Sequence, residues 1–318
     1  MSWKGKKVLI TGISGFIGSN LARRLVELGA DVSGIVRSTN LDNEDILSKC
    51  NVYTGDICDY DFIRQIISSN EIDTVFHLAA YAIVRISARD PMTTYAVNVM
   101  GTVSLLEACR SVGKCSKIIV ASSDKAYGDH DRLPYNESFP LQPKNTYDVS
   151  KACMDMIAQS YAHNYGMPVV VTRCSNVYGP YDYNKSRIIP NTIIRLLEGK
   201  KPTLYSDVEM MEREFIYIQD VVDAYLMLAE CKINRPHPVY NIGIDNPIRI
   251  RKLVEMISTL VTGKVVPPEI IIREPAFKEI ERQCIDPSKL TEDTGWSPRD
   301  YLESGLHKTI GWYRLNHI

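Results

Sequence analysis

The strongest constraint on the fold is a regular alternation of apolar runs and amphipathic segments in the first 180 residues. Apolar runs of strand length lie at 7–12, 31–36, 51–56, 73–80, 116–123 and 168–179, and helical patterns lie at 16–29, 60–70, 91–113 and 145–166. Nearly continuous apolar strands that alternate with helices are typical of a parallel sheet covered by helices on both faces. The sequence therefore predicts an α/β protein with a doubly wound parallel sheet.

The pattern changes beyond residue 180. Proline, tyrosine and isolated charges increase, and helical segments near 188–199, 220–231 and 250–260 mix with short strands near 203–206, 214–218 and 239–242. We expect a smaller mixed α/β lobe beside the carboxyl ends of the sheet strands. The expected division is a sheet domain at 1–178 with a return segment near 214–244, and a second lobe at 179–213 and 245–318.

Composition narrows the class of protein. The chain has 318 residues, of which 45% are hydrophobic and 24% charged, so its composition is that of a soluble globular protein. Its net charge is −1, so no overall electrostatic field favours nucleic acid or a membrane surface. No run approaches a membrane span, and the N-terminus enters a strand without a signal-peptide core. The eight cysteines are scattered and the six histidines lack metal-site spacing, so we expect free thiols, no metal site and a cytoplasmic location.

A glycine-rich loop joins the first strand to the first helix. "TGISGFIG" places Gly12, Gly15 and Gly18 where backbone N–H groups can approach a pyrophosphate at a helix N-terminus. Three glycines alone are weak evidence, but the strand before them and the helix after them predict dinucleotide binding. Arg37 follows the second strand, where an acid often binds the ribose of NAD, and an arginine favours the 2′-phosphate of NADP over NAD. Asp56, after the third strand, is placed to bind adenine.

A tyrosine and a lysine lie four residues apart on one predicted helix. In "YDVSK", Tyr147 and Lys151 share a helix face. A neighbouring ammonium lowers the pKa of a phenol, and a phenolate can remove a proton from a substrate hydroxyl while hydride leaves for a nicotinamide. Ser123, at the end of a strand, can hydrogen-bond the same oxygen. The pair alone is a weak signal and gains weight from the glycine loop and Ser123.

The chain resembles the extended short-chain dehydrogenase/reductases, in particular the NAD(P)-dependent nucleotide-sugar epimerase/dehydratase family. The resemblance rests on "TGISGFIG", "GDICD", "VFHLAA", "NVMGT", "ASSDKAYG", "YDVSK", "RCSNVYGP" and "EREFIYIQDVVDAY", in family order over nearly the whole chain. It implies a Rossmann domain that binds NAD or NADP tightly and a C-terminal lobe that binds a nucleoside-diphosphate sugar. The cofactor contacts that it implies, beyond those above, are Ser14, Phe16, Ile17, Ile57, Leu78, Ala79, Ala80, Asn98, Tyr147 and Lys151.

The resemblance also implies substrate contacts. Asn176 in "SNVYGP" and Arg213 in "EREF" match family residues that meet the sugar diphosphate, a role that suits a fork-shaped guanidinium. Further candidates for substrate contact are Tyr81, Arg187 and Arg282. The alternative for the two arginines is that they form ion pairs at the surface. The chain departs from the family in "SDVEMME", where Gly-Asp-Gly is frequent, and after "HLAA", where a polar residue is usual. These departures leave the identity of the nucleotide base and of the sugar undetermined.

Asp124 and Lys125 separate the possible reactions. A 4-epimerase needs only Tyr147, Lys151 and freedom for the keto sugar to rotate, whereas a 4,6-dehydratase also needs an acid near O6 and a base near C5. Most dehydratases of the group carry Asp-Glu here, and Asp-Lys resembles the CDP-glucose 4,6-dehydratase branch. We therefore expect a dehydratase with Asp124 as acid and Lys125 as base or electrostatic partner. The alternatives are a 4-epimerase, a simple salt bridge between the neighbours, and a catalytically silent protein that senses NAD(P).

Two helices carry more apolar surface than one sheet can cover. The segments 91–113 and 145–166 include the small and apolar residues Ala96, Val99, Val103, Ala152, Met156 and Ala158. We expect these helices to pair with their mates in a homodimer through a four-helix bundle, as the family resemblance also implies.

Overall fold

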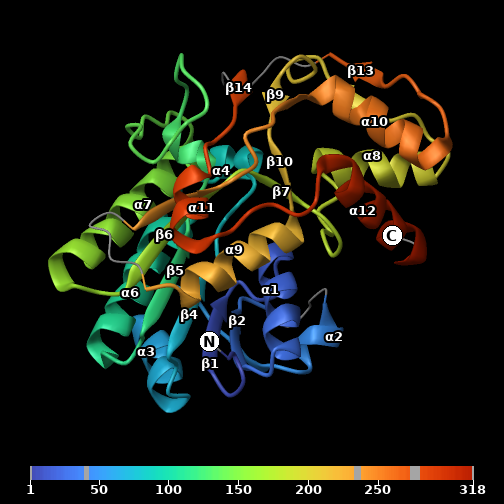
Figure 1. Cartoon of the computed structure of the whole chain (residues 1–318). Helices are drawn as coiled ribbons and strands as arrows, with labels where there is room; N and C mark the ends of the chain where they lie inside the picture. Colours follow the sequence, from blue (N-terminus) through green and yellow to red (C-terminus); the bar gives the residue numbers. More distant parts are fainter. Residues whose placement is uncertain (1, 39–42, 233–237, 273–279, 317–318) are drawn as a thin grey trace.

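A seven-stranded parallel sheet forms the centre of the molecule (Figure 1). The computed structural model describes residues 2–38, 43–232, 238–272 and 280–316. In the spatial order of the sheet, the strands are β11 (Val239–Ile242), β6 (Val169–Cys174), β5 (Lys117–Ala121), β4 (Thr74–His77), β1 (Lys7–Thr11), β2 (Asp31–Val36) and β3 (Asn51–Thr54). The predicted doubly wound α/β fold is confirmed. The strand order reverses between β1 and β4, and such a point is where ligands bind outside the carboxyl ends of the strands.

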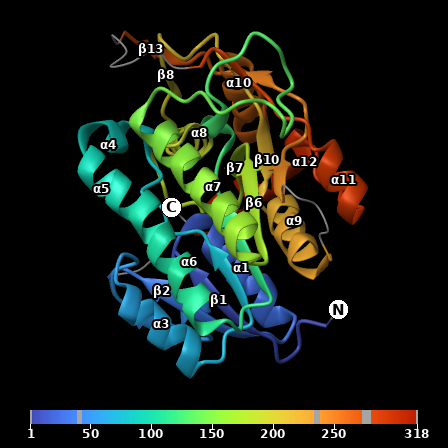
Figure 2. The ribbon, with the colours of Figure 1, turned by 90° about the vertical axis from the view of Figure 1, so that its left-hand side faces the viewer.

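Helices cover both faces of the sheet. Successive side chains of each strand point to opposite faces, so an apolar core lies on each side. On one face lie α3 (Tyr60–Ser69), α6 (Gly101–Val112) and α7 (Thr146–Tyr165), and on the other lie α1 (Phe16–Glu27), α2 (Glu44–Leu47) and α9 (Ile218–Glu230). Leu9 of β1 packs in the first core, whereas its neighbours Val8 and Ile10 pack in the second. This period of two is the pattern of a strand with both faces buried. Figure 2 shows α6 and α7 side by side on one outer face.

Two predicted elements are interrupted. The helix expected at 91–113 is a succession of α5 (Pro91–Tyr95), a π-helical turn (Ala96–Met100) and α6, and α4 (Val84–Arg89), which we did not predict, precedes it. The apolar run 168–179 is divided at Ser175, because β6 ends at Cys174 while β7 (Asn176–Tyr178) leaves the main sheet to pair with β10 (Phe215–Tyr217). Both interruptions lie next to the carboxyl edge of the sheet.

The C-terminal lobe lies over that edge (Figure 1). Its helices are α8 (Ile188–Leu197), α10 (Ile250–Thr262), α11 (Ser288–Thr294), which packs on β11, and α12 (Leu302–Asn316). Its short strands are β8 (Thr203–Tyr205) with β13 (Glu269–Ile271), and β9 (Glu212–Arg213) between β12 (Ile248–Arg249) and β14 (Arg282–Gln283). Ile193, Leu253 and Ile310 of the lobe belong to the same apolar core as Val8, so one continuous core joins the sheet and the lobe.

None of the helices within the described ranges combines the length and the apolar character that a bilayer crossing requires. All eight cysteines are described, and each is a free thiol.

Candidate active site

A cavity of about 880 Å³ lies at the carboxyl ends of the sheet strands, between the sheet and the lobe. This volume lies within the range of small-molecule sites. All the site residues expected from the sequence line it except Asn98 and Arg282. Residues from the glycine loop, the turn after β5, helix α7 and strand β9 thus face one space although they are far apart in the sequence.

The glycine loop has the shape that a pyrophosphate requires. Gly12 has a φ of +72°, and a Cβ there would lie 2.9 Å from the Cα of Ala79. A Cβ on Gly18 would lie 2.2 Å from the carbonyl oxygen of Gly12, so neither position accepts a side chain. Helix α1 begins at Phe16, and its N-cap residue Gly15 has no side chain to cap the first backbone N–H groups. The loop therefore offers backbone donors and the positive end of a helix to an anion, which fits a dinucleotide.

Two side chains expected to bind the adenosine end lie at the rim of the cavity. Arg37 follows β2 and Asp56 follows β3, and both are exposed. Asp56 Oδ1 already accepts the backbone N–H of Cys58, at 2.8 Å. Val36, at the end of β2, is buried and offers no carboxylate to a ribose.

Asn98 lies behind the cavity wall instead of in it. The π-helical turn directs its buried side chain toward the protein, where Nδ2 donates to Ser150 Oγ at 2.9 Å and Oδ1 accepts the backbone N–H of Tyr81 at 2.7 Å. Asn98 does not line the cavity, because both polar ends of the amide are used in joining α7 to the segment after β4, and its contact with the cofactor stays a prediction.

Ser123, Tyr147 and Lys151 come together on the cavity wall. Lys151 Nζ donates to the carbonyl oxygen of Ala121 at 2.8 Å and lies 6.0 Å from the centre of the Tyr147 ring. Burial lowers the pKa of Lys151 to about 8. Burial raises the pKa of Tyr147 above its ordinary value, while a hydrogen bond with Ser123 acts in the opposite direction. The expected lowering of the Tyr147 pKa is therefore not seen, because desolvation of the phenolate outweighs the groups that favour it.

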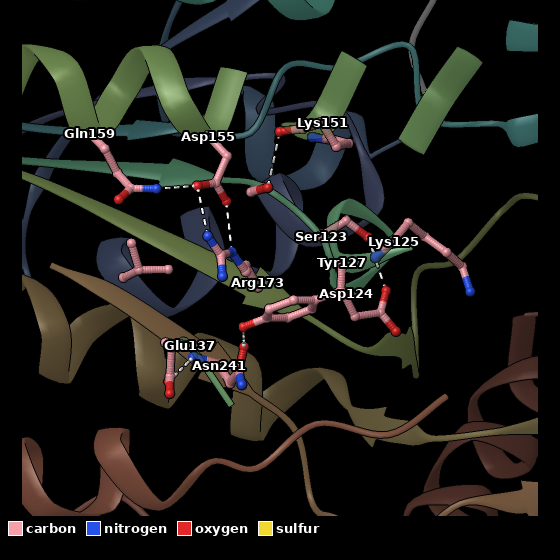
Figure 3. A network of polar contacts seen from close by, with 12 residues as sticks. Ser123, Asp124, Lys125, Tyr127, Glu137, Lys151, Asp155, Gln159, Arg173 and Asn241 are labelled. Carbon is pink, nitrogen blue, oxygen red and sulfur yellow. Dashed lines mark hydrogen bonds and ion pairs between the residues drawn. The ribbon is translucent and has the colours of Figure 1, made fainter. Parts of the chain in front are cut away.

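A short 3₁₀ turn, Asp124–Tyr127, directs Asp124 and Lys125 to different partners. Asp124 is 2% exposed, and its Oδ1 accepts the Ser123 hydroxyl at 3.1 Å. Burial raises the pKa of Asp124, and the nearby charges of Lys125 and Arg213 act against this shift. Lys125 Nζ donates to Gln283 Oε1, and Figure 3 shows its side chain extending away from the Asp124 carboxyl group. A buried carboxyl with a raised pKa is suited to act as a general acid.

The expected substrate arginines have different surroundings. Arg213 is 7% exposed, and its Nη1 donates to the carbonyl oxygens of Glu212 and Glu281 at 3.0 and 3.2 Å. Arg187 pairs with Asp182 at 2.9 Å on the cavity wall. Arg282 does not reach the cavity, because β14 directs it outward: its side chain is 67% exposed and pairs with Glu212 at 2.9 Å. Asn176 Nδ2 donates to the Glu214 carbonyl oxygen at 2.9 Å.

A buried ion pair lies one helical turn beyond Lys151. Asp155 of α7 binds Arg173 of β6 through two hydrogen bonds of 2.9 and 3.0 Å, and both side chains are almost fully buried (Figure 3). The Arg173 guanidinium lies 4.6 Å from the ring centre of Tyr127, whose hydroxyl donates to Asn241 Oδ1 at 2.8 Å. Sequence reasoning missed this network, although an arginine within the apolar run of β6 was a signal of it.

Two buried carboxyl groups were also missed. Asp182 lines the cavity, and burial raises its pKa while Arg187 acts against the shift. Glu214 follows Arg213 and is fully buried; burial raises its pKa to about 7. Its carboxyl group accepts backbone N–H groups of Ile244 and of Ile285, the latter at 2.9 Å, which joins three segments of the lobe. The Glu214 contacts have no local sequence signal, because their partners are distant in the chain, whereas Asp182 and Arg187 are only five residues apart.

The family model described as GDP-mannose 4,6 dehydratase matches residues 9–309. The chain belongs to this family. The family assignment agrees with the resemblance found in the motifs.

Individual relatives cover almost the whole chain. A dTDP-glucose 4,6-dehydratase from Shigella flexneri is 32% identical over 98% of this chain and 93% of its own length. Among solved structures, a dTDP-glucose 4,6-dehydratase from Streptomyces venezuelae with NAD bound has a TM-score of 0.87 and 28% identity, and covers 98% of each chain. A UDP-glucose 4-epimerase from Thermotoga maritima, solved with UDP-glucose, has a TM-score of 0.88 and 29% identity, covering 98% of this chain and 100% of its own.

Proposed function

We propose that the protein is a nucleotide-sugar 4,6-dehydratase that uses a bound NAD or NADP. The single observation that carries this proposal is the buried Asp124 carboxyl group, with its raised pKa, in the same cavity as Ser123, Tyr147 and Lys151. Oxidation at C4 requires only the last three residues, whereas loss of water also requires an acid. Relatives with the printed activity of 4,6-dehydratase support the same conclusion.

The first step is oxidation at C4. A bound nicotinamide dinucleotide supplies the hydride acceptor for C4 and later the hydride donor for C6, so that it is unchanged overall. Tyr147 takes the proton of the C4 hydroxyl, and Ser123 holds the same oxygen by a hydrogen bond. The Lys151 ammonium stabilises the phenolate form of Tyr147 by its positive charge.

The second step is loss of water across C5 and C6. Because the C4 ketone acidifies the C5 proton, a base can remove it and leave an enolate. Asp124 gives its proton to O6, the C6–O bond breaks, and water leaves. Hydride then reaches C6 and a proton returns to C5, so the product is a 4-keto-6-deoxy sugar nucleotide. Lys125 serves this step as the base or by stabilising the enolate charge.

The sugar nucleotide occupies the part of the cavity beneath the lobe. Arg213, Arg187 and Asn176 line this part and offer the charge and donors that a diphosphate requires. Tyr81 lines the wall after β4. We propose no direct contact for Arg282, because its charge is paired outside the cavity.

The homodimer is also a proposal, supported by exposed methionines on α5, the π-helical turn and α7, which pack together at one face of the molecule. Figure 2 shows α5 and α7 on this face. Met92, Met100 and Met156 are 83%, 54% and 62% exposed on this face. Ala152 and Ala158, which we expected there, are buried inside the chain, and Ala158 belongs to the apolar core that α7 covers. The division into a Rossmann domain at 1–178 and a substrate lobe, like the cytoplasmic location, stays a prediction.

A 4-epimerase is the second candidate, because the UDP-glucose 4-epimerase from Thermotoga maritima has nearly the same fold. The test is to incubate the purified protein with UDP-, CDP-, GDP- and dTDP-glucose and to record the product masses. Loss of one water from any of them supports the dehydratase. An unchanged mass together with a changed sugar stereochemistry would establish the epimerase instead.

A further inference from the structure

Gln283 joins the two residues that distinguish a dehydratase from an epimerase. It lies on β14, is fully buried, and is about 160 residues away from them in the chain. Its Nε2 donates to the backbone carbonyl oxygen of Asp124 at 2.9 Å, and its Oε1 accepts a hydrogen bond from Lys125 Nζ. Gln283 does not line the cavity, so it acts on the site through neighbouring residues and not by direct contact with a ligand there.

We propose that Gln283 is a positioning residue for the Asp124–Lys125 pair. Its Nε2 fixes the backbone of the turn that carries Asp124, and its Oε1 holds the Lys125 ammonium in a separate direction. The inference rests on the proposed function, since an epimerase would not need this pair. No family motif identified in the sequence includes Gln283, and its role follows from its two contacts.

The amide is suited to this role because it is neutral and has a donor and an acceptor on one rigid group. A carboxylate at this place would form an ion pair with Lys125, and an apolar side chain would leave a partly buried ammonium without this acceptor, which is costly. The neutral Gln283 amide accepts a hydrogen bond from the Lys125 ammonium but does not neutralise its positive charge. That charge then acts on Asp124, where it opposes the effect of burial.

Gln283 also connects the acid to the strand that carries the diphosphate candidate. In the small sheet, Gln283 pairs with Arg213 of β9, and Arg213 Nη1 donates to the carbonyl oxygen of Glu281 at 3.2 Å, two residues before Gln283. The position of the acid turn therefore depends on the same strand that fixes Arg213.

Other titratable groups among the described residues interact with Asp124. Arg213 lies on β9 and acts on Asp124 by its charge, and Asp124 in turn influences four further groups. These are Tyr147 on α7, Cys174 at the end of β6, Glu214 after β9, and Tyr135 in the loop after the turn. A change at Gln283 must be distinguished from a change at any of these groups, so the test compares two substitutions with opposite electrostatic effects.

The test measures water loss against pH for Gln283→Met and Gln283→Glu. The limb of the profile that belongs to Lys125 is identified as the one that Lys125→Met removes. Gln283→Glu should move this limb to higher pH, because a carboxylate favours the ammonium, and Gln283→Met should move it to lower pH, because the ammonium loses an acceptor. At the wild-type optimum, Gln283→Met should lower the rate of water loss roughly ten- to a hundredfold, as expected for a misplaced acid.

A second readout separates positioning from general damage. In Gln283→Met the reduction of bound cofactor by substrate, followed by its absorbance, should stay within about twofold of wild type, since this step uses Ser123, Tyr147 and Lys151. Gln142→Met is the matched control, because the Gln142 amide also bonds the neighbouring loop, at Asp129 and His130, without touching the pair. It should leave both steps and the pH profile unchanged.

Three outcomes would overturn the inference. The first is that the wild-type enzyme removes water and both Gln283 variants keep the wild-type rate and pH profile. The second is that the Lys125 limb of the pH profile shifts in the same direction in both variants. The third is an equal loss of cofactor reduction and of water loss in both variants, which would assign Gln283 a structural role. A wild-type protein that removes water from no sugar nucleotide would overturn the proposed function itself, and the inference with it.

Discussion

Asp124, the proposed acid, is buried at a cost to the stability of the fold. Its pKa in the folded state is raised above the unfolded value, chiefly by burial. Its contribution to stability is therefore fully present below the unfolded pKa and is lost as the pH rises through the folded pKa. At neutral pH the folded protein carries the penalty of an ionised or newly protonated carboxyl group, and each unit of pKa difference corresponds to about 1.4 kcal/mol.

Asp124→Asn should therefore be more stable than wild type at neutral pH, since an amide does not titrate and can still accept the Ser123 hydroxyl. The advantage in melting temperature should disappear as the pH falls below the unfolded pKa of an aspartate. The same variant should still allow substrate to reduce the bound cofactor but should lose water about 10²–10⁴ times more slowly. Thermal melts across pH and product analysis check both parts. A variant as active as wild type would exclude Asp124 as the acid.

Arg37 tests the cofactor preference. If its guanidinium holds a 2′-phosphate, Arg37→Ala should weaken NADP binding by about 1.5–3 kcal/mol and leave NAD almost unaffected. Calorimetry on cofactor-free protein measures both affinities, and Arg64→Ala, on exposed α3, serves as the control. Equal losses for the two cofactors would refute the assignment, as would a wild-type protein that prefers NAD.

Among the elements, α7, which carries Tyr147 and Lys151, is joined to β6 by the Asp155–Arg173 pair. Removing one partner leaves the other charge buried without its counter-ion, so Arg173→Met should destabilise the fold by about 3–5 kcal/mol. The double variant Asp155→Leu with Arg173→Met should recover a large part of this loss, because no buried charge is left. Urea unfolding of the wild type, both single variants and the double variant measures the coupling. If the effects of the single variants simply add, the pair is not a coupled unit.

The elements could be predicted where their sequence signal is local. The strands β1, β2 and β5 and helices α1, α3 and α7 follow from periodicity, and the glycine loop, Tyr147 and Lys151 follow from spacing within these elements. The inward turn of Asn98 could not be predicted, because it depends on a π-helical insertion. Gln283 and Glu214 were missed because their roles depend on partners that only the folded chain brings near.

A motif that matches in sequence does not fix the direction in which its side chains point. Arg282 has a side chain of the expected type, but its place on β14 directs it to Glu212 and away from the cavity. Gln283, the next residue, faces inward because successive side chains of a strand point to opposite sides. One position of register therefore decides which of the two residues acts on the site.

For the whole molecule, the exposed apolar face on α5, the π-helical turn and α7 predicts a homodimer. Light scattering at micromolar concentration should give twice the chain mass of 36.0 kDa. Met156→Glu should shift the protein toward monomer, because it places a charge on that face. Met210→Glu is the control, since Met210 is equally exposed but lies in the lobe. A wild-type monomer would contradict the proposal.

The central claim is that this cavity removes water from a sugar nucleotide by moving hydride within one substrate molecule. The most direct measurement uses the nucleotide sugar that reacts in the panel, labelled with deuterium at C4, and analyses the product by mass spectrometry and NMR. We expect a product that has lost one water and carries the deuterium at C6. A product of unchanged mass, with the deuterium still at C4 and the C4 stereochemistry altered, would contradict it.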